Sequence, residues 1–116
     1  PEFEFNFTLD NGTLGRIKRA ASALGHNEIS IRPNNGSIQI SVLDTKDATS
    51  NAFTIDVDGS YTDWVDFNFV LNVNNLKIVN EDFEVSISKK LISQFKSVQS
   101  DIEYFIALEK SSTFGE

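Results

Sequence analysis

The apolar residues near the start of the chain change their spacing once, from every second position to every third or fourth. Residues 2–9 alternate apolar and polar, which is typical of a half-buried β-strand. A helical spacing follows over residues 13–24, with one apolar face made of Leu14, Ile17, Ala20, Ala21 and Leu24. Asn11 or Thr13 can cap the start of this helix, and Gly25 is its expected end.

Alternation with a period of two predicts β-strands over most of the remaining chain, and one short helical segment is expected over residues 73–79. The expected strands cover residues 28–32, 37–43, 53–57, 65–71, 83–88, 92–98 and 102–109. Pro33 to Gly36 carries the turn residues of a hairpin between the first two of these strands. In the last strand, Phe105 and Ala107 share one face. The sequence therefore predicts an α+β fold.

The first strand and helix have a counterpart later in the chain. At a shift of 62 positions, Phe5, Asn6, Phe7, Leu9, Leu14 and Ile17 fall on Phe67, Asn68, Phe69, Leu71, Leu76 and Val79. A second match pairs residues 53–55 with residues 104–106 at a shift of 51. Short Phe-rich strands can match by chance, but the alternative is a strand–helix–three-strand unit used twice, over residues 1–59 and 60–116. Two such units related by a pseudo-twofold axis would pack their two helices on curved antiparallel sheet.

Length and composition fit one domain of ordinary size. The chain has 116 residues, a net charge of -7 and ten Phe, which suits a well-packed sheet core. Cysteine and methionine are absent, which excludes a disulfide, a cysteine zinc site and a cysteine nucleophile. No apolar run is long enough for a membrane span. The first residue is Pro1, so we expect a cleaved or truncated piece of a longer protein.

Positive charge is concentrated in the two predicted helical regions. Residues 11–27 and 67–80 contain no acid, and their cations are Arg16, Lys18, Arg19 and Lys77. The rest of the chain holds six cations and 17 acids. On a helical wheel Arg16 and Arg19 point away from the apolar face, whereas Lys18 lies at its border. Either this is the local variation found in any acidic protein, or it is one cationic face suited to weak, non-specific contact with a nucleic-acid backbone.

The motifs that could carry chemistry are weak. Asp56 to Gly59 hints at a calcium loop, but Thr54 and Val65 occupy positions where such a loop requires acids. His26 is the one histidine, and no Cys or metal cluster lies near it in the sequence. A position in a surface loop is the simpler interpretation of His26. We therefore expect no enzyme activity, no metal and no cofactor.

The order of the elements and several short motifs resemble a known family. Three features carry the similarity: the repeated unit, the strand from Phe67 to Phe69 leading to Asn74-Asn75-Leu76-Lys77, and the ending Tyr104 to Glu109 with Ser112-Thr113. In these features the chain is similar to the C-terminal domain of the DNA polymerase sliding clamp of T-even-type bacteriophages and related cyanobacterial viruses. The resemblance covers nearly the whole chain. It implies a DNA-clamp fold and a processivity factor, a non-enzymatic ring around duplex DNA that tethers the replicative polymerase.

The resemblance also implies roles for particular positions. Arg16, Arg19 and Lys77 would face the DNA in the hole of the ring, with Lys18 at the margin. The strand over residues 53–57 would be an edge that joins a neighbouring subunit, with the apolar residues Phe53, Ile55 and Val57. Unpaired sheet edges need such partners.

Two further contacts follow from the same resemblance. The strand over residues 102–109 would face the companion domain of its own subunit. A pocket that receives an apolar peptide of a partner protein would lie near Pro1, Phe3, Leu108 and Phe114.

In the family, two domains make a subunit, and three subunits close the ring. The N-terminal domain and linker are absent from this chain, so it is either a fragment of a subunit that forms a trimer when full length, or one of six single domains. The expected partners are duplex DNA, a DNA polymerase and an ATP-dependent clamp loader, in the cytoplasm of an infected host cell and without a membrane. A viral structural or assembly protein with no DNA role is the alternative, and it would need no cationic helix face. A small hydrolase is a weaker alternative, because the sequence offers no nucleophile–base pair.

Overall fold

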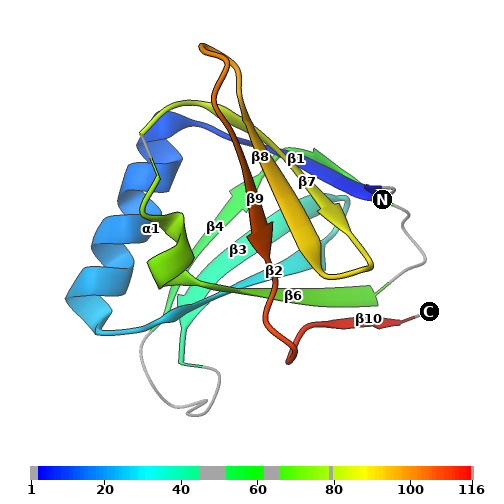
Figure 1. Ribbon diagram of the computed structural model, residues 1–116. Coiled ribbons are helices and arrows are strands. Elements are labelled where there is room, and N and C mark those ends of the chain that lie inside the picture. Colours follow the sequence, from blue (N-terminus) through cyan, green and yellow to red (C-terminus); the bar gives the residue numbers. More distant parts are fainter. Residues whose placement is uncertain (1–2, 45–51, 62–65, 79, 116) are drawn as a thin grey trace.

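Two five-stranded antiparallel sheets face each other, and one α-helix runs along one side of the pair (Figure 1). The computed structural model describes residues 3–44, 52–61, 66–78 and 80–115, and every structural statement below concerns these residues. In chain order the elements are β1 (Phe5–Leu9), α1 (Asn11–Leu24), β2 (Glu28–Asn34), β3 (Ser37–Leu43), β4 (Phe53–Val57), β5 (Gly59–Ser60), β6 (Asp66–Asn72), the 3-10 turn η1 (Val73–Leu76), β7 (Phe83–Ser88), β8 (Ile92–Ser97), β9 (Glu103–Ala107) and β10 (Thr113–Gly115). The expected α+β class is confirmed.

The first strand of each half of the chain belongs to the sheet of the other half. One sheet has the strand order β5-β1-β7-β8-β9, and the other has the order β10-β6-β2-β3-β4. The same succession of elements therefore occurs twice, with β1 and β6, β4 and β9, and β5 and β10 in matching places. Because each sheet needs a strand from the other half, neither half can complete its sheet alone.

Phenylalanines at matching positions meet in the centre of the core. The ring centroids of Phe5 and Phe67 are 4.7 Å apart, and Phe69 lies 5.0 Å from Phe5 and 5.1 Å from Phe67. All three side chains are buried, since alternation along β1 and β6 turns them inward. β1 and β6 belong to different sheets, so this aromatic cluster joins the two sheets. Aromatic pairs of this kind stabilise by roughly 0.5–1.5 kcal/mol beyond the area that they bury.

Helix α1 begins earlier than the sequence predicts. Its N-cap is Asp10 rather than Asn11 or Thr13, and the Asp10 carboxylate accepts a hydrogen bond of 2.7 Å from the backbone N–H of Thr13. The expected end is confirmed: Gly25 has φ of 70°, the left-handed conformation that glycine adopts most readily. Leu14, Ile17 and Ala21 are buried on the apolar face, as the helical spacing predicts.

The second helical segment is shorter than the sequence predicts, and it is a 3-10 turn instead of an α-helix. The segment expected to be helical over residues 73–79 forms only the four-residue turn η1, and residue 79 lies outside the described residues. Asn72 caps this turn by accepting from the N–H of Asn74, and asparagines disfavour a helix interior because their side chains compete for backbone groups. Leu76 is nevertheless buried, like its counterpart Leu14.

Strands β5 and β10 are not predicted by the alternation, because they are two and three residues long. They exist because β1 and β6 each have one free edge, which the short strands pair. Strand β2 extends to Asn34, so the hairpin turn is only Asn35-Gly36, both with positive φ. Pro33 is tolerated within β2 because the pairing with β6 has already ended at Ile31.

Candidate nucleic-acid interface

The outward side of α1 carries two exposed arginines, Arg16 and Arg19, opposite the buried apolar face. The Arg16 guanidinium lies 5.5 Å from the centre of the Phe53 ring on β4. The Arg19 side chain lies back along the helix, with Nη1 3.2 Å from the place that a Cβ at Gly15 would occupy. Because the neighbouring residues on this side of the helix are small, they do not cover the two guanidinium groups.

Lys18 does not point away from the domain as the two arginines do. Its half-buried ammonium donates hydrogen bonds of 2.9 Å to the backbone O of Ile78 and 2.9 Å to Oδ1 of Asn80. Burial lowers the pKa of Lys18 from its ordinary value of 10.5, because a charged amine is disfavoured away from water. The ammonium group of Lys18, which we expect at the margin of the DNA-facing side, is therefore engaged in hydrogen bonds within the chain.

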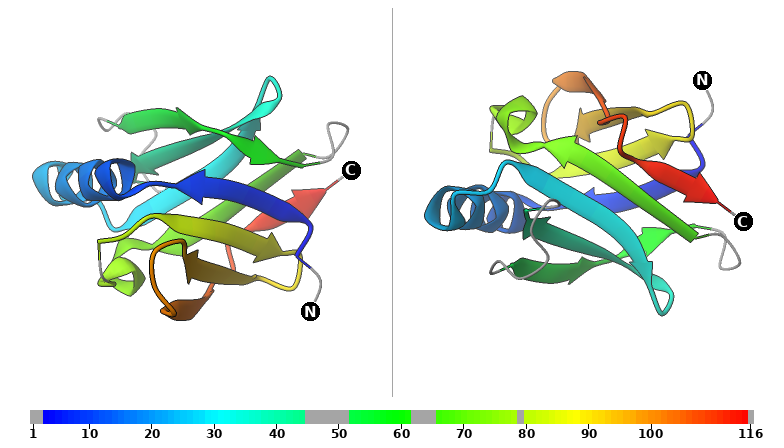
Figure 2. Two further views of the ribbon diagram at one scale, coloured as in Figure 1. Left: turned by 90° about the horizontal axis from the view of Figure 1, so that it is seen from above. Right: turned by 90° about the horizontal axis from the view of Figure 1, so that it is seen from below.

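Lys77 follows η1 directly and is exposed. The two views of Figure 2 show α1 and η1 on the same side of the domain, and the Lys18 hydrogen bond to Ile78 connects the two regions. An arrangement with the two predicted helical segments on opposite faces would have separated Lys77 from Arg16 and Arg19. The structure instead brings the segments that carry Arg16, Arg19 and Lys77 to one side.

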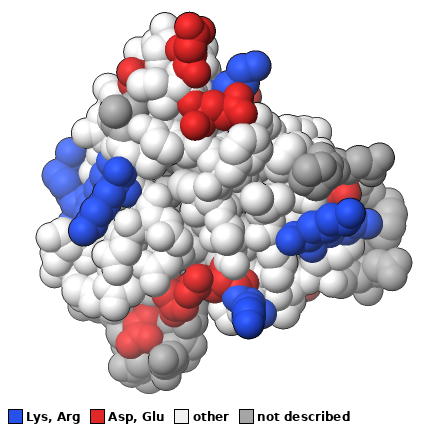
Figure 3. Space-filling view, in the orientation of Figure 1, with Lys and Arg blue, Asp and Glu red and all other residues white. Residues whose placement is uncertain are grey.

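The segment from Asn11 to Asn27, which contains α1, has no acidic residue. Figure 3 shows Lys and Arg side chains over α1 with uncharged atoms around them, while Asp and Glu gather above and below. Two carboxylates lie at the beginning of the helix: Asp10 caps it, and Asp82 Oδ1 accepts from the N–H of Asn11 at 2.7 Å. Carboxylates at this end complement the helix dipole. They leave the rest of the helix cationic.

The N-cap makes a testable contribution to stability. Hydrogen bonding to the Thr13 N–H is the main reason that the pKa of Asp10 lies below its ordinary value of 3.8. A carboxyl with a lowered pKa stabilises the fold above its unfolded-state pKa, and this contribution disappears as the pH falls through the lower folded-state value. We expect Asp10→Ala to reduce the free energy of unfolding by about 1 kcal/mol at neutral pH.

Urea unfolding of the wild type and Asp10→Ala at several pH values checks this expectation. The difference between the two proteins should shrink when the pH falls below the ordinary value of 3.8. Asp10→Asn keeps a capping oxygen without the charge, so it should retain much of the stability and lose the pH dependence. A difference that persists unchanged in acid would show that the cap does not depend on the ionised carboxyl.

Strands β4 and β9 are edge strands of their sheets, as expected for strands that join neighbours. The side chains predicted at the subunit edge turn inward, however: Phe53, Ile55 and Val57 are half-buried and pack against the core. Strand β4 has one unpaired backbone edge, and its exposed side chains are Thr54 and Asp56.

Strand β9 exposes an apolar side chain on its outer face. Phe105 is 59% exposed, and Ala107 on the same face is also exposed. The sequence pattern placed these two residues on one face, opposite to the buried Ile106. The outer side of β9 therefore provides both a backbone edge and an apolar surface.

The residues predicted for a partner-peptide pocket differ in their exposure. Pro1 lies outside the described residues, while Phe3 is half-buried. Leu108 is buried in the core, so its side chain is not offered to a partner in this conformation. Phe114 is half-buried between Phe5, at a centroid distance of 5.5 Å, and the Lys89 ammonium, which lies 5.1 Å from its ring centre.

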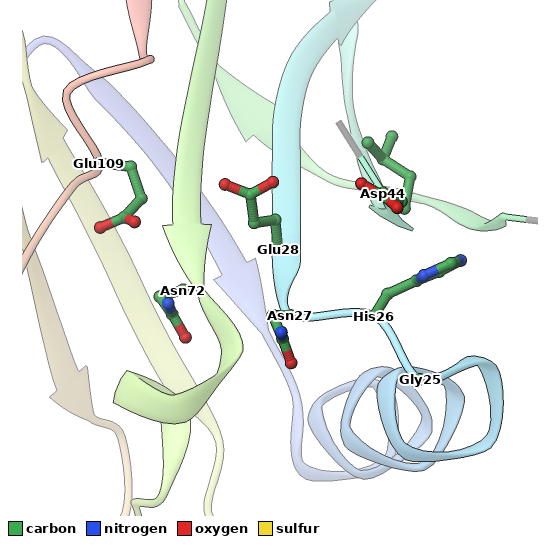
Figure 4. Close-up of a pocket in the computed structure, with 8 residues that line it drawn as sticks. Gly25, His26, Asn27, Glu28, Asp44, Asn72 and Glu109 are labelled. Atoms are coloured by element: carbon green, nitrogen blue, oxygen red, sulfur yellow. The ribbon is translucent and has the colours of Figure 1, made fainter. Parts of the chain in front are cut away.

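A polar hollow of about 340 Å³ lies beside the C-terminal end of α1, and sequence reasoning did not predict it. Figure 4 shows His26 and Asp44 on one side of the hollow, Asn72 and Glu109 on the other, and Glu28 between them. Among the described lining residues there is no Ser, Thr, Cys or Lys that could act as a nucleophile. Within the described part of the chain, no group of three or more His, Cys, Asp or Glu side chains could hold a metal ion. None of the described helices is long and apolar enough to cross a membrane.

Solved structures show which class of fold the two sheets and the helix define. A sliding clamp from Pseudomonas aeruginosa, described as a DNA polymerase III beta subunit, matches with a TM-score of 0.68 at 13% identity, over 95% of this chain and 31% of that chain. A putative DNA polymerase III beta subunit from Eubacterium rectale matches with a TM-score of 0.67 at 15% identity, over 94% of this chain and 31% of that chain. The fold is therefore the DNA-clamp fold that the sequence predicts.

The sequence places the chain in one family of clamps. The model of the family described as gp45 sliding clamp, C terminal, matches residues 6–110, so the chain belongs to this family. The sliding clamp of Vibrio phage KVP40 is 35% identical over 105 residues, which are 89% of this chain and 46% of that protein. The chain thus spans about half the length of this curated relative. Membership does not favour the alternative of a viral structural protein without a DNA role.

Proposed function

We propose that this chain is the C-terminal domain of a DNA polymerase processivity factor, a ring that encircles duplex DNA and tethers the replicative polymerase. The observation that carries the proposal is the collection of Arg16, Arg19 and Lys77 on one side of a domain whose net charge is -7. A cationic side on an anionic domain is attracted to phosphates, while the other faces are repelled by them. Membership of the sliding clamp family supports the same role.

The contact with DNA would be electrostatic and without sequence preference. Arg16 and Arg19 would approach phosphates from α1, and Lys77 would approach from the segment after η1. A few exposed cations give a weak attraction that salt screens, which suits a protein that must slide along the duplex. Lys18 contributes charge to this side but spends its hydrogen bonds within the domain.

The ring would be closed through the sheet edges. Backbone N–H and C=O groups along β4 would pair with an edge strand of a neighbouring subunit, with Phe53, Ile55 and Val57 holding the strand in place from inside. The outer side of β9, with Phe105, would face the companion domain of its own subunit. As the family resemblance implies, this chain would supply one of two domains in each subunit, and three full-length subunits would close the ring.

The protein would carry out no chemistry itself. A DNA polymerase would bind the ring through a short apolar peptide, for which Phe3 and Phe114 are better placed than the buried Leu108, and Pro1 is the fourth candidate. A separate clamp loader would open the ring. The setting would be replication of viral DNA in the cytoplasm of the host cell, with no metal, cofactor or membrane.

Topological linkage to DNA is the decisive test. Full-length protein containing this chain is loaded on nicked circular plasmid with its loader and ATP, and free protein is removed by gel filtration. We expect the protein to stay on the circle and to leave within minutes after a restriction enzyme linearises the plasmid. Equal retention on circular and linear DNA would contradict an encircling ring, and so would equal loss from both.

A further inference from the structure

The segment that carries Lys77 has little regular structure to hold it. Helix α1 has 14 residues, whereas the matching element of the second half is the four-residue turn η1. The described residues between Leu76 and the start of β7 at Phe83 belong to no helix or strand. The position of Lys77 must therefore be determined by contacts with another part of the domain.

Lys18 supplies such contacts from α1. Its ammonium donates 2.9 Å hydrogen bonds to the backbone O of Ile78 and to Oδ1 of Asn80. The first acceptor belongs to the residue that directly follows Lys77, so the bond fixes the backbone beside Lys77. Ile78 is itself half-buried against the core, which anchors the same residue from its other side.

The environment of Lys18 distinguishes it from the cations around it. Arg16, Arg19 and Lys77 are exposed, whereas the Lys18 side chain is half-buried and burial lowers its pKa. An ammonium group has three N–H donors, and two of them are used here. A hydrogen bond from a charged donor is stronger than a neutral one, and partial burial protects it from water and salt.

We propose that Lys18 is a positioning residue. It ties the irregular segment after η1 to α1, so that Lys77 lies beside Arg16 and Arg19 on the cationic side. In this role it compensates for the shortness of η1, which has four residues where α1 has 14. The inference rests on the proposed function, because it assumes that Lys77 contacts DNA, but it assigns Lys18 an action through Lys77 instead of through a phosphate.

Asn80→Ala gives the sharpest test, because it removes one acceptor of the tie without changing any charge. Asn80 is exposed, so the variant should fold. In the full-length protein, we expect Asn80→Ala to weaken binding to a short duplex at low salt and to reduce the salt slope, by no more than the reduction of about one expected for Lys77→Ala. The double variant Asn80→Ala/Lys77→Ala should bind like Lys77→Ala alone, because Asn80 acts only through Lys77.

Lys18→Met keeps the apolar stem and removes the donor. Hydrogen exchange should then accelerate in the amides of residues 77, 78 and 80–82 and stay unchanged in the middle of α1, and Asn80→Ala should show the same pattern more weakly. Lys90→Met, at an exposed position in the turn between β7 and β8, is the matched control and should accelerate neither segment. Unchanged exchange in residues 77, 78 and 80–82 of both variants would overturn the proposed tie.

The DNA measurements separate the two proposals. If Lys77→Ala binds DNA like the wild type, the DNA contact assigned to Lys77 is wrong, and positioning of Lys77 for DNA is wrong with it. If Lys77→Ala weakens binding while Asn80→Ala does not, only the positioning role of Lys18 is overturned.

Discussion

Replacing both Arg16 and Arg19 by Glu should abolish processive DNA synthesis by the full-length clamp. The double reversal turns the exposed side of α1 from cationic to anionic, so phosphates that were attracted are repelled. We expect affinity for a short duplex to fall on the order of tenfold or more at low salt, and the salt slope to fall by about two, one for each lost phosphate contact. Fluorescence anisotropy at several salt concentrations and the length of primer extension products measure the two effects.

A matched control separates the place of the charge from its amount. Lys90→Glu/Lys110→Glu changes the net charge equally at exposed positions away from α1, and it should leave synthesis processive. Arg16 also lies over the Phe53 ring, so its loss is expected to cost about 0.5–1 kcal/mol of folding free energy, which urea unfolding will report. Processive synthesis by a folded Arg16→Glu/Arg19→Glu variant would refute the DNA-facing role of α1.

The parts of the fold that the sequence predicts are those in which local pattern and tertiary burial agree. Alternation in β1 places Phe5 inward, and helical spacing in α1 places Leu14 and Ile17 inward, because in both cases the period of the element matches one buried face. The second helix fails this rule. Leu76 is buried as expected, but Asn74 and Asn75 disfavour a helix interior, and the helical turn ends at Leu76.

The candidate site shows the same division. The distribution of charged residues along the sequence identifies the segments that carry the cations, because Lys and Arg are charged in any exposed position. What each cation touches could not be predicted, since the acceptors of Lys18 lie 60 and 62 residues away and the ring beside Arg16 belongs to β4. The inward direction of Phe53, Ile55 and Val57 was readable from alternation alone, and it leaves the backbone of β4 as the part available to a neighbour.

Gly59→Ala should cause a large loss of stability, because β5 lies so close to β1 and to Ile38 of the other sheet that no Cβ fits at this glycine. A Cβ there would lie 2.4 Å from Cδ1 of Ile38 and 2.7 Å from the backbone O of Asn6. Ile38 is fully buried on β3, and Asn6 belongs to the strand that pairs with β5, so neither neighbour moves without disturbing a sheet. Overpacking of this kind costs about 1–3 kcal/mol, or a fall in the thermal midpoint of roughly 4–12 °C for a domain of this size.

Gly12→Ala is the matched control for the added methyl group. Gly12 lies in the first turn of α1, where a Cβ meets only Asp10 Oδ1 at 3.5 Å, an ordinary contact distance. Alanine favours a helix over glycine, so this variant should be as stable as the wild type or more stable, by up to about 1 kcal/mol. Thermal and urea unfolding of both variants check the pair. Equal stability of the two variants would show that Ile38 and β1 can shift enough to accommodate the methyl group, and that the close contact at Gly59 is not required for stability.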